Sequence, residues 1–334
     1  MEINQKNLES LYNKGVELGD LGKNEEAVVN YDKVLEINPN DFESLYNKGF
    51  ALSRLGKHKE AVVCYGKALE INPNDFEALY NKGVALGELE KNEEAILSYN
   101  KALEINPNHM NTLYNKGLSL YFLGRYKDAV VCYDKSLEID PNDFDALYNK
   151  GFAMNDLGEH KEAVIWFDKV LKSYPNHTNS LYNKGVALAR LEKQEEAVVS
   201  YDNALKVKPN HTNTLYNKGV ALARLGKQEE AVVSYDIALK IDPDHTNTLS
   251  SKGLSLHFLD RFKEAVASYD KMLKINPNHT NTLSNKGVAL CFLYRYEEGV
   301  ASFNKALDIN PNDSDILSNK DLAQSKLNQK INHG

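Results

Sequence analysis

The sequence has few cysteines and no long apolar run, and each scarcity bears on where the protein works. Three cysteines occur among 334 residues, and an odd count without paired spacing fits a reducing compartment. No stretch approaches the roughly 18 apolar residues of a membrane-spanning helix. The polar N-terminus has no apolar signal core. We therefore expect a cytoplasmic protein without membrane insertion.

An excess of positive charge is also missing. The formal net charge is −7, which argues against nucleic acid as a partner because that partner needs a basic surface. The sequence contains no glycine-rich phosphate loop, no nucleophile elbow and no His-Glu-x-x-His motif. We therefore expect no enzyme, no cofactor and no metal site.

Proline is scarce as well, but its positions are regular. The nine prolines, from Pro39 to Pro311, are each separated by 34 residues. The sequence Leu-Tyr-Asn-Lys-Gly has the same period from Leu11–Gly15 to Leu215–Gly219, and weaker copies follow to residue 321. A fixed period of this size indicates a repeat array.

Nine full repeats are predicted over residues 8–313, after a polar lead-in at 1–7 and before a capping helix and tail at 314–334. The repeats start at residues 8, 42, 76, 110, 144, 178, 212, 246 and 280, and positions within a repeat are numbered 1 to 34. No linker or change of composition interrupts them, so we expect a single domain.

Apolar residues recur at helical spacing twice in each repeat. In the second repeat, Leu45 and Leu52 belong to one stripe, and Ala61 and Tyr65 belong to another. A glycine-containing break separates the stripes, and proline ends the second helix. The aspartate at position 34 is placed to cap the next helix. Each repeat is therefore expected to be helix A, turn, helix B, turn.

A glycine at position 8 recurs in all nine repeats, inside helix A. Glycine there is unfavourable by roughly 0.5–1 kcal/mol relative to alanine, so close packing of helix B must offset it. The facing positions agree, with alanine at position 20 in eight repeats, Gly299 in the ninth, and an aromatic residue at position 24.

This pattern resembles the tetratricopeptide repeat family. The matching residues of the second repeat are Leu45, Gly49, Leu52, Ala61, Tyr65, Ala68 and Pro73. Leucine at position 4 and lysine at position 7 depart from the family pattern. Pentatricopeptide repeats are one residue longer and usually basic, so period and charge both disfavour them. The resemblance implies an all-α, right-handed α-solenoid, or superhelix, whose helices A line a concave groove through positions 2, 5, 6, 9, 12 and 13.

Positions 5 and 6 supply the candidate binding residues of this groove. An asparagine amide both donates and accepts hydrogen bonds, so it can pair with an extended peptide backbone, and tyrosine adds apolar area and a hydroxyl. Positions 12 and 13 vary, which suggests that specificity resides there. The candidates are Tyr12, Asn13, Tyr46, Asn47, Tyr80, Asn81, Tyr114, Asn115, Tyr148, Asn149, Tyr182, Asn183, Arg190, Tyr216, Asn217 and Arg224.

Two other repeated residues are interpreted as structural. The histidines at position 34 are expected to be solvated turn residues, because successive turns lie too far apart to share a metal ion. The position-7 lysines are expected to pack their stems between repeats, with the frequent aspartate at position 25 as an ion-pair partner. The aspartates are Asp32, Asp134, Asp168, Asp202, Asp236 and Asp270.

The leading hypothesis is a non-enzymatic scaffold whose groove binds an extended segment of a partner protein or peptide. A structural or assembly role through end-to-end contacts, including self-association, is one alternative, and a regulatory domain working with a separate enzyme is another. The groove lacks the lysines of the clamp that binds chaperone tails. Acidic residues at positions 2 and 13 give way to Asn179, Arg190 and Arg224, so we expect repeats one to five to prefer a basic segment and repeats six and seven an acidic or polar one.

Overall fold

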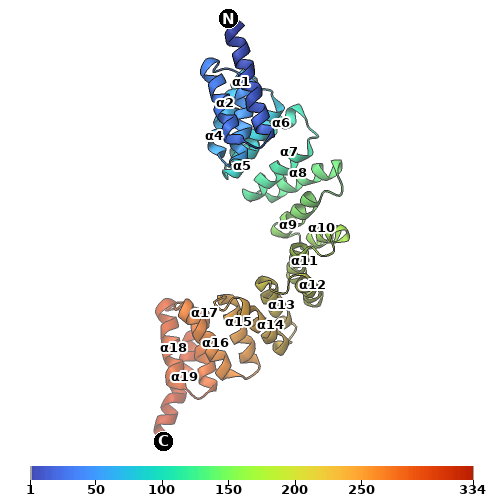
Figure 1. Ribbon diagram of the computed structural model, residues 1–334. Coiled ribbons are helices and arrows are strands. Elements are labelled where there is room, and N and C mark those ends of the chain that lie inside the picture. Colours follow the sequence, from blue (N-terminus) through green and yellow to red (C-terminus); the bar gives the residue numbers. More distant parts are fainter. Residues whose placement is uncertain (1, 334) are drawn as a thin grey trace. The chain divides into compact units, whose positions relative to one another are not determined.

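The computed structural model describes residues 2–333, and these residues form nineteen α-helices and no strand (Figure 1). The prediction of an all-α repeat fold is confirmed. No helix among the described residues combines the length and the apolar character needed to cross a bilayer. The chain divides into two compact units, Met1–Trp166 and Phe167–Gly334, and each is described by itself.

The first unit contains antiparallel pairs of helix A and helix B. Its A helices are α1 (Glu2–Asp20), α3 (Phe42–Arg54), α5 (Phe76–Glu88), α7 (Met110–Phe122) and α9 (Phe144–Asp156). Its B helices are α2 (Asn24–Ile37), α4 (His58–Ile71), α6 (Asn92–Ile105) and α8 (Tyr126–Ile139), and α10 (His160–Ser173) contains the boundary between the units.

The second unit continues the alternation and ends in one long helix. Its A helices are α11 (Thr178–Arg190), α13 (Thr212–Arg224), α15 (Thr246–Phe258) and α17 (Thr280–Phe292). Its B helices are α12 (Gln194–Val207), α14 (Gln228–Ile241), α16 (Phe262–Ile275) and α18 (Tyr296–Ile309), and α19 (Ser314–His333) follows where the sequence predicts a cap.

The helix boundaries follow the period, with one difference. From α3 onward, each A helix begins at the residue where the sequence predicts a repeat to start. In contrast, α1 begins at Glu2, so most of the expected polar lead-in is helical. The boundary between the two units lies inside α10 and not at a linker. The single domain expected from the sequence remains a prediction.

The core of a repeat is the contact between glycine at position 8 and the aromatic ring at position 24. A β-carbon built on Gly83 would lie 2.4 Å from a ring carbon of Tyr99, and one on Gly219 would lie 2.4 Å from Tyr235. Both rings are almost fully buried. The close approach of helix B that the glycine predicts is therefore made by the aromatic ring of that helix.

The turn between helices A and B needs a left-handed residue at position 15. Five repeats place glycine there, for example Gly226 with φ 77°, whereas Glu192 and three other non-glycine residues adopt φ near 60°. The turn is closed by a hydrogen bond from the N–H of position 16 to the carbonyl of position 11, as between Lys193 and Leu188 (3.0 Å). This closure is the Schellman arrangement that favours glycine.

Replacing Glu192 with glycine is expected to raise the free energy of unfolding by about 0.5–1 kcal/mol, because the left-handed conformation is unfavourable for a side chain that has a β-carbon. Urea unfolding followed by circular dichroism measures the change. The matched control is Gly226→Ala, one repeat later, which should destabilise by a similar amount. A loss of stability on Glu192→Gly would contradict this account of the turn.

Candidate functional site

One face of the A helices, here called the helix-A surface, consists of positions 2, 5, 6, 9, 12 and 13. In α3, position 2 is the exposed Glu43, and positions 5 and 6 are the half-buried Tyr46 and Asn47. Position 9 is Phe50, which remains 42% exposed although it is aromatic. The surface therefore presents apolar area between polar groups, as protein-binding surfaces do.

Hydrogen bonds join the candidate tyrosines and asparagines into a ladder. The amide nitrogen of each asparagine donates to the tyrosine hydroxyl of the preceding repeat, 35 residues earlier. The distances are 3.1 Å for Asn47 to Tyr12, 3.1 Å for Asn81 to Tyr46, 3.3 Å for Asn115 to Tyr80, 2.9 Å for Asn149 to Tyr114 and 2.9 Å for Asn217 to Tyr182. The sequence places these residues on one surface but does not reveal that they bind one another.

Aromatic neighbours hold the tyrosine rings in place. The ring of Tyr46 stacks on that of Phe42 with the ring centroids 6.4 Å apart, and the ring of Tyr80 stacks on that of Phe76 with the centroids 6.3 Å apart. The imidazole of His109 meets Tyr80 at its edge, with the ring centroids 5.3 Å apart. Fixed rings keep their hydroxyls in a constant position, which reduces the conformational entropy lost when a ligand binds.

Burial and acidic neighbours keep these hydroxyls protonated. Burial raises the pKa of Tyr46 to about 12, and the carboxylate of Glu77 at position 2 of the next repeat contributes to the rise. Burial likewise raises the pKa of Tyr114 to about 12, with Asp145 in the same role. Each hydroxyl accepts a hydrogen bond from asparagine, so its own proton can be donated elsewhere.

The other candidate residues of the helix-A surface differ from one another in burial and position. Tyr148 stacks on Phe144 at 6.1 Å, and Asn183 is buried within α11. Arg190 and Arg224 are the exposed last residues of α11 and α13, outside the tyrosine–asparagine ladder. The structure therefore brings tyrosine and asparagine together and leaves the two arginines at the end of the surface. The remaining ladder positions are Asn13 and Tyr216, and the Tyr216 ring lies 5.4 Å from that of His245.

Four of the five position-34 histidines cap the next helix with their side chains, all except His211, which corrects the expectation of solvated turn residues. The ring Nδ1 of His109 accepts a hydrogen bond from the backbone N–H of Thr112 at 3.3 Å, and His177 does the same for Ser180. Asp41 and Asp75 cap other A helices with a carboxylate oxygen. The described residues contain no group of three or more His, Cys, Asp or Glu side chains arranged to hold a metal ion.

Acidification should weaken the His177 cap. Burial lowers the pKa of His177, so the charged form is less favourable in the folded protein than in the unfolded chain. The resulting stability is present above the unfolded pKa of roughly 6.5 and is lost as the pH falls through the folded value. Because a protonated Nδ1 cannot accept the cap hydrogen bond, we expect a loss of about 1 kcal/mol.

Urea unfolding at pH 7.5 and pH 5 measures this loss, with His177→Asp as the matched variant. Aspartate is the cap that other repeats use, and it stays ionised across this range. The difference between the two pH values should therefore be smaller in the variant. An equal difference in both proteins would rule out His177 as its source.

The expected pairs between position-7 lysines and position-25 aspartates are confirmed. Each lysine meets the aspartate of the preceding repeat, for example at 2.6 Å between Lys218 and Asp202. We call these pairs the lysine–aspartate row. Its members are Lys48–Asp32, Lys150–Asp134, Lys184–Asp168, Lys218–Asp202, Lys252–Asp236 and Lys286–Asp270.

Family models match nearly the whole length of the repeats. Models described as tetratricopeptide repeat match residues 42–75, 76–109, 111–143, 132–165, 247–279 and 281–313. A model described as TPR repeat matches residues 15–56, and one described as the N-terminal TPR repeats region of Psidin matches residues 152–256. No curated protein matches the chain.

Several solved structures are similar. The crystal structure of YrrB, described as a TPR protein with an unusual peptide-binding site, is 27% identical, with a TM-score of 0.51, over 56% of this chain and 97% of its own. A tetratricopeptide repeat protein from Parabacteroides merdae ATCC 43184 is 21% identical, with a TM-score of 0.54, over 75% of this chain and 99% of its own. A chain of the APC/C hetero-tetramer Cut9–Hcn1 is 16% identical, with a TM-score of 0.52, over 89% of this chain and 59% of its own. The last two show similarity of fold alone.

Proposed function

Because this chain belongs to the tetratricopeptide repeat family, we propose that it is a non-enzymatic scaffold that binds an extended segment of a partner protein along the helix-A surface. The YrrB structure supports this proposal, since that protein has a peptide-binding site and its likeness covers more than half of the present chain. The candidate residues at positions 5 and 6 lie on the same surface.

The tyrosine–asparagine ladder carries the proposal. Each asparagine orients one tyrosine hydroxyl by donating to it, as Asn81 does for Tyr46, and the hydroxyl proton is left to donate to a partner. Backbone carbonyls are the acceptors that every extended peptide presents at regular intervals. A series of oriented donors therefore suits an extended segment whatever its sequence, while the variable positions 12 and 13 would select among segments.

The charge of the surface would set the orientation of the bound segment. Position 2 is acidic in four of the five repeats of the first unit, where Asn111 is the exception. It is asparagine in the repeats of the second unit, for example at Asn179 and Asn213. A partner segment with a basic half and an acidic or polar half would then bind in one direction. Because exposed ion pairs are weak, this polarity should act mainly on association rate and salt dependence.

The test is selection from a displayed library of random twelve-residue linear peptides. Selected peptides should lose affinity about five- to thirtyfold on the triple replacement Tyr46→Phe, Tyr80→Phe and Tyr114→Phe, because up to three hydrogen bonds to the segment disappear. The rings remain, so packing is preserved. Unchanged affinity, measured by fluorescence polarisation, would contradict binding through the hydroxyls.

Crosslinking locates the bound segment. A photoreactive phenylalanine analogue in place of Phe50, on the helix-A surface, should crosslink a selected peptide. The matched control is the same analogue in place of Val63, which lies on helix B and is 57% exposed. Crosslinking from Val63 alone would place the peptide elsewhere. Association of the chain with itself at rising concentration, without peptide binding, would favour the assembly role instead.

A further inference from the structure

The lysine–aspartate row has gaps, and they show where a carboxylate is missing. One gap, Asn304 opposite Lys320, adjoins the last helix. The other two are Gly66 in the second repeat and Asn100 in the third, opposite Lys82 and Lys116. A β-carbon built on Gly66 would lie 4.0 Å from the Nζ of Lys82. Position 25 therefore still faces the position-7 lysine of the next repeat where the aspartate is absent. Neither lysine forms an ion pair within the part of the chain that the structure describes.

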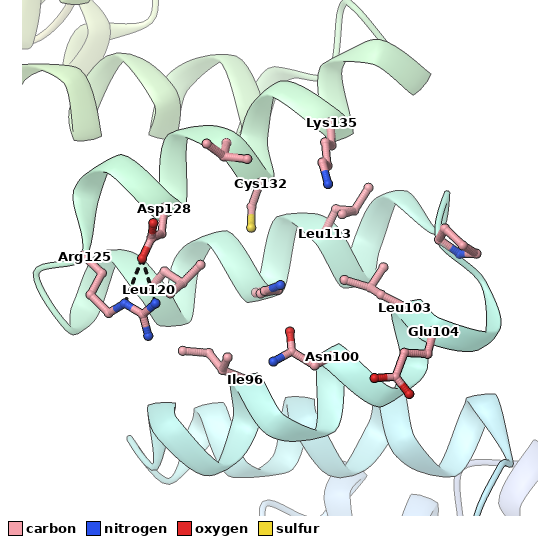
Figure 2. A pocket seen from close by; sticks show the side chains of 13 residues that line it. Ile96, Asn100, Leu103, Glu104, Leu113, Leu120, Arg125, Asp128, Cys132 and Lys135 are labelled. Atoms are coloured by element: carbon pink, nitrogen blue, oxygen red, sulfur yellow. Dashed lines mark hydrogen bonds and ion pairs between the residues drawn. The ribbon is translucent and has the colours of Figure 1, made fainter.

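Lys116 lines a hollow formed by residues of α6, α7 and α8. Figure 2 shows this hollow from close by. Its volume is about 640 Å³. Asn100 from α6 and Cys132 and Lys135 from α8 point into it, and Leu113 of α7 contributes apolar floor. The space is therefore large enough for a side chain from another molecule, and a lysine lies in its wall.

An equivalent hollow, here called the reference hollow, exists two repeats earlier, and it shows how the site looks when the aspartate of the row is present. It lies between α2 and α4, has a volume of about 540 Å³ and is lined by the equivalent residues, with Asp32 in place of Asn100 and Lys48 in place of Lys116. There, the Asp32 carboxylate binds Lys48. The reference hollow shows which group the position-7 lysine accepts in this setting, namely a carboxylate arriving from the position-25 side.

The two hollows differ in the net charge of the side chains that line them. The hollow at Lys116 is lined by three cationic side chains and two carboxylates, whereas the reference hollow is lined by two cations and three carboxylates. Arg125 is already bound by Asp128 at 2.7 Å, which leaves the surplus charge with the lysines. Burial raises the pKa of the Cys132 thiol, so sulfur adds no competing anion at neutral pH.

Exposed apolar side chains accompany the hollow. Val131 lines it and is 54% exposed. Leu97, at the same position of the preceding B helix, lies outside the lining and is 63% exposed. We propose that this hollow binds an acidic side chain, Asp or Glu, of a partner protein, whose carboxylate pairs with Lys116 as Asp32 pairs with Lys48. Apolar side chains flanking that acidic residue pack on Val131 and Leu97. The site lies on the side of the B helices and is separate from the helix-A surface.

The probe is the peptide acetyl-Leu-Glu-Leu-amide, with acetyl-Leu-Gln-Leu-amide as its uncharged match. Nuclear magnetic resonance of the full chain, with ¹³C-methylated lysines and constant ionic strength, follows the Lys116 signal, which Lys116→Arg identifies. The glutamate peptide should shift this signal to saturation, and the glutamine peptide should bind about fivefold more weakly, the upper range for an exposed pair. Equal effects of both peptides would overturn the proposal.

Two variants exchange the properties of the hollows. Asn100→Asp should abolish the response of Lys116, because the internal carboxylate then occupies the site. Asp32→Asn should make Lys48 respond to the glutamate peptide. A response of Lys116 that survives Asn100→Asp, or a silent Lys48 in Asp32→Asn, would show that the missing carboxylate does not define the site.

Two further outcomes would also overturn the proposal that the hollow binds an acidic side chain. Sodium acetate that shifts Lys116 at the same concentration as the glutamate peptide would reduce the hollow to a small-anion site, without docking on Val131 and Leu97. A Lys116 signal that changes with protein concentration in the absence of peptide would assign the hollow to a second copy of this chain. Neither outcome depends on whether the helix-A surface binds a segment, so the two proposals fail separately.

Discussion

Replacing Gly83 with leucine is expected to lower the free energy of unfolding by about 3 kcal/mol, at the upper end of the penalty for overpacking. The first added carbon alone would lie 2.4 Å from the Tyr99 ring, closer than atoms can pack. The ring cannot move aside, because Tyr99 is 2% exposed and enclosed by neighbouring helices. Urea unfolding of the full chain, followed by circular dichroism, measures the loss.

The matched control lies one helical turn later. A β-carbon on Gly87 would lie 3.9 Å from the Tyr99 hydroxyl oxygen, which is ordinary van der Waals contact. Gly87→Ala should therefore stabilise the protein by up to about 0.5–1 kcal/mol, because Gly87 lies in the last turn of α5 and has room for a methyl group. Opposite signs are thus expected at two glycines of the same helix. Equal effects would mean that glycine at position 8 is not required by packing.

Replacing Asp134 with asparagine is expected to destabilise the protein by about 1–3 kcal/mol. Its partner Lys150 is only 5% exposed, and the lysine Nζ lies 3.6 Å from the centre of the Trp166 ring. Removing one partner of a buried ion pair leaves a poorly hydrated charge, which typically costs about 3–5 kcal/mol. We place the expected value lower because the side chain of Asp134 is itself 47% exposed.

The other pairs of the row provide the comparison. In Lys218–Asp202 the side chain of the lysine is 25% exposed, so Asp202→Asn should cost about 0–1 kcal/mol. The difference is attributed to Trp166, since repeats six to nine have serine at that position. In a double-mutant cycle, Trp166→Ser should reduce the cost of Asp134→Asn. An unchanged cost would mean that the tryptophan does not shield Lys150 from water.

The sequence predicts best those interactions that recur within each repeat or between adjacent repeats. The period, the glycine at position 8, the alanine at position 20 and the ring at position 24 are sufficient to predict paired helices, because each repeat packs only on itself and its neighbours. The lysine–aspartate pairs were predictable for the same reason, since both residues recur with the period. The candidate residues of the helix-A surface remain predictions, although the structure joins most of them through hydrogen bonds.

The features that the sequence did not reveal depend on distances between neighbouring repeats. The bond from Asn47 to Tyr12 and the contact of Trp166 with Lys150 require particular helix spacings and rotamers, which a period does not specify. The histidine caps depend on where Nδ1 lies relative to a backbone N–H, although a shared position with Asp41 and Asp75 was a usable signal. The missing carboxylate at Asn100 is visible in the sequence, but the hollow beside Lys116 is seen only in the packing of the helices. The sequence by itself thus determined the helical repeat and its packing residues, because these act over neighbouring turns. Tertiary structure alone decided the contacts that need a particular rotamer or helix spacing, such as the tyrosine–asparagine bonds, and where the packing leaves a hollow beside an unpaired lysine.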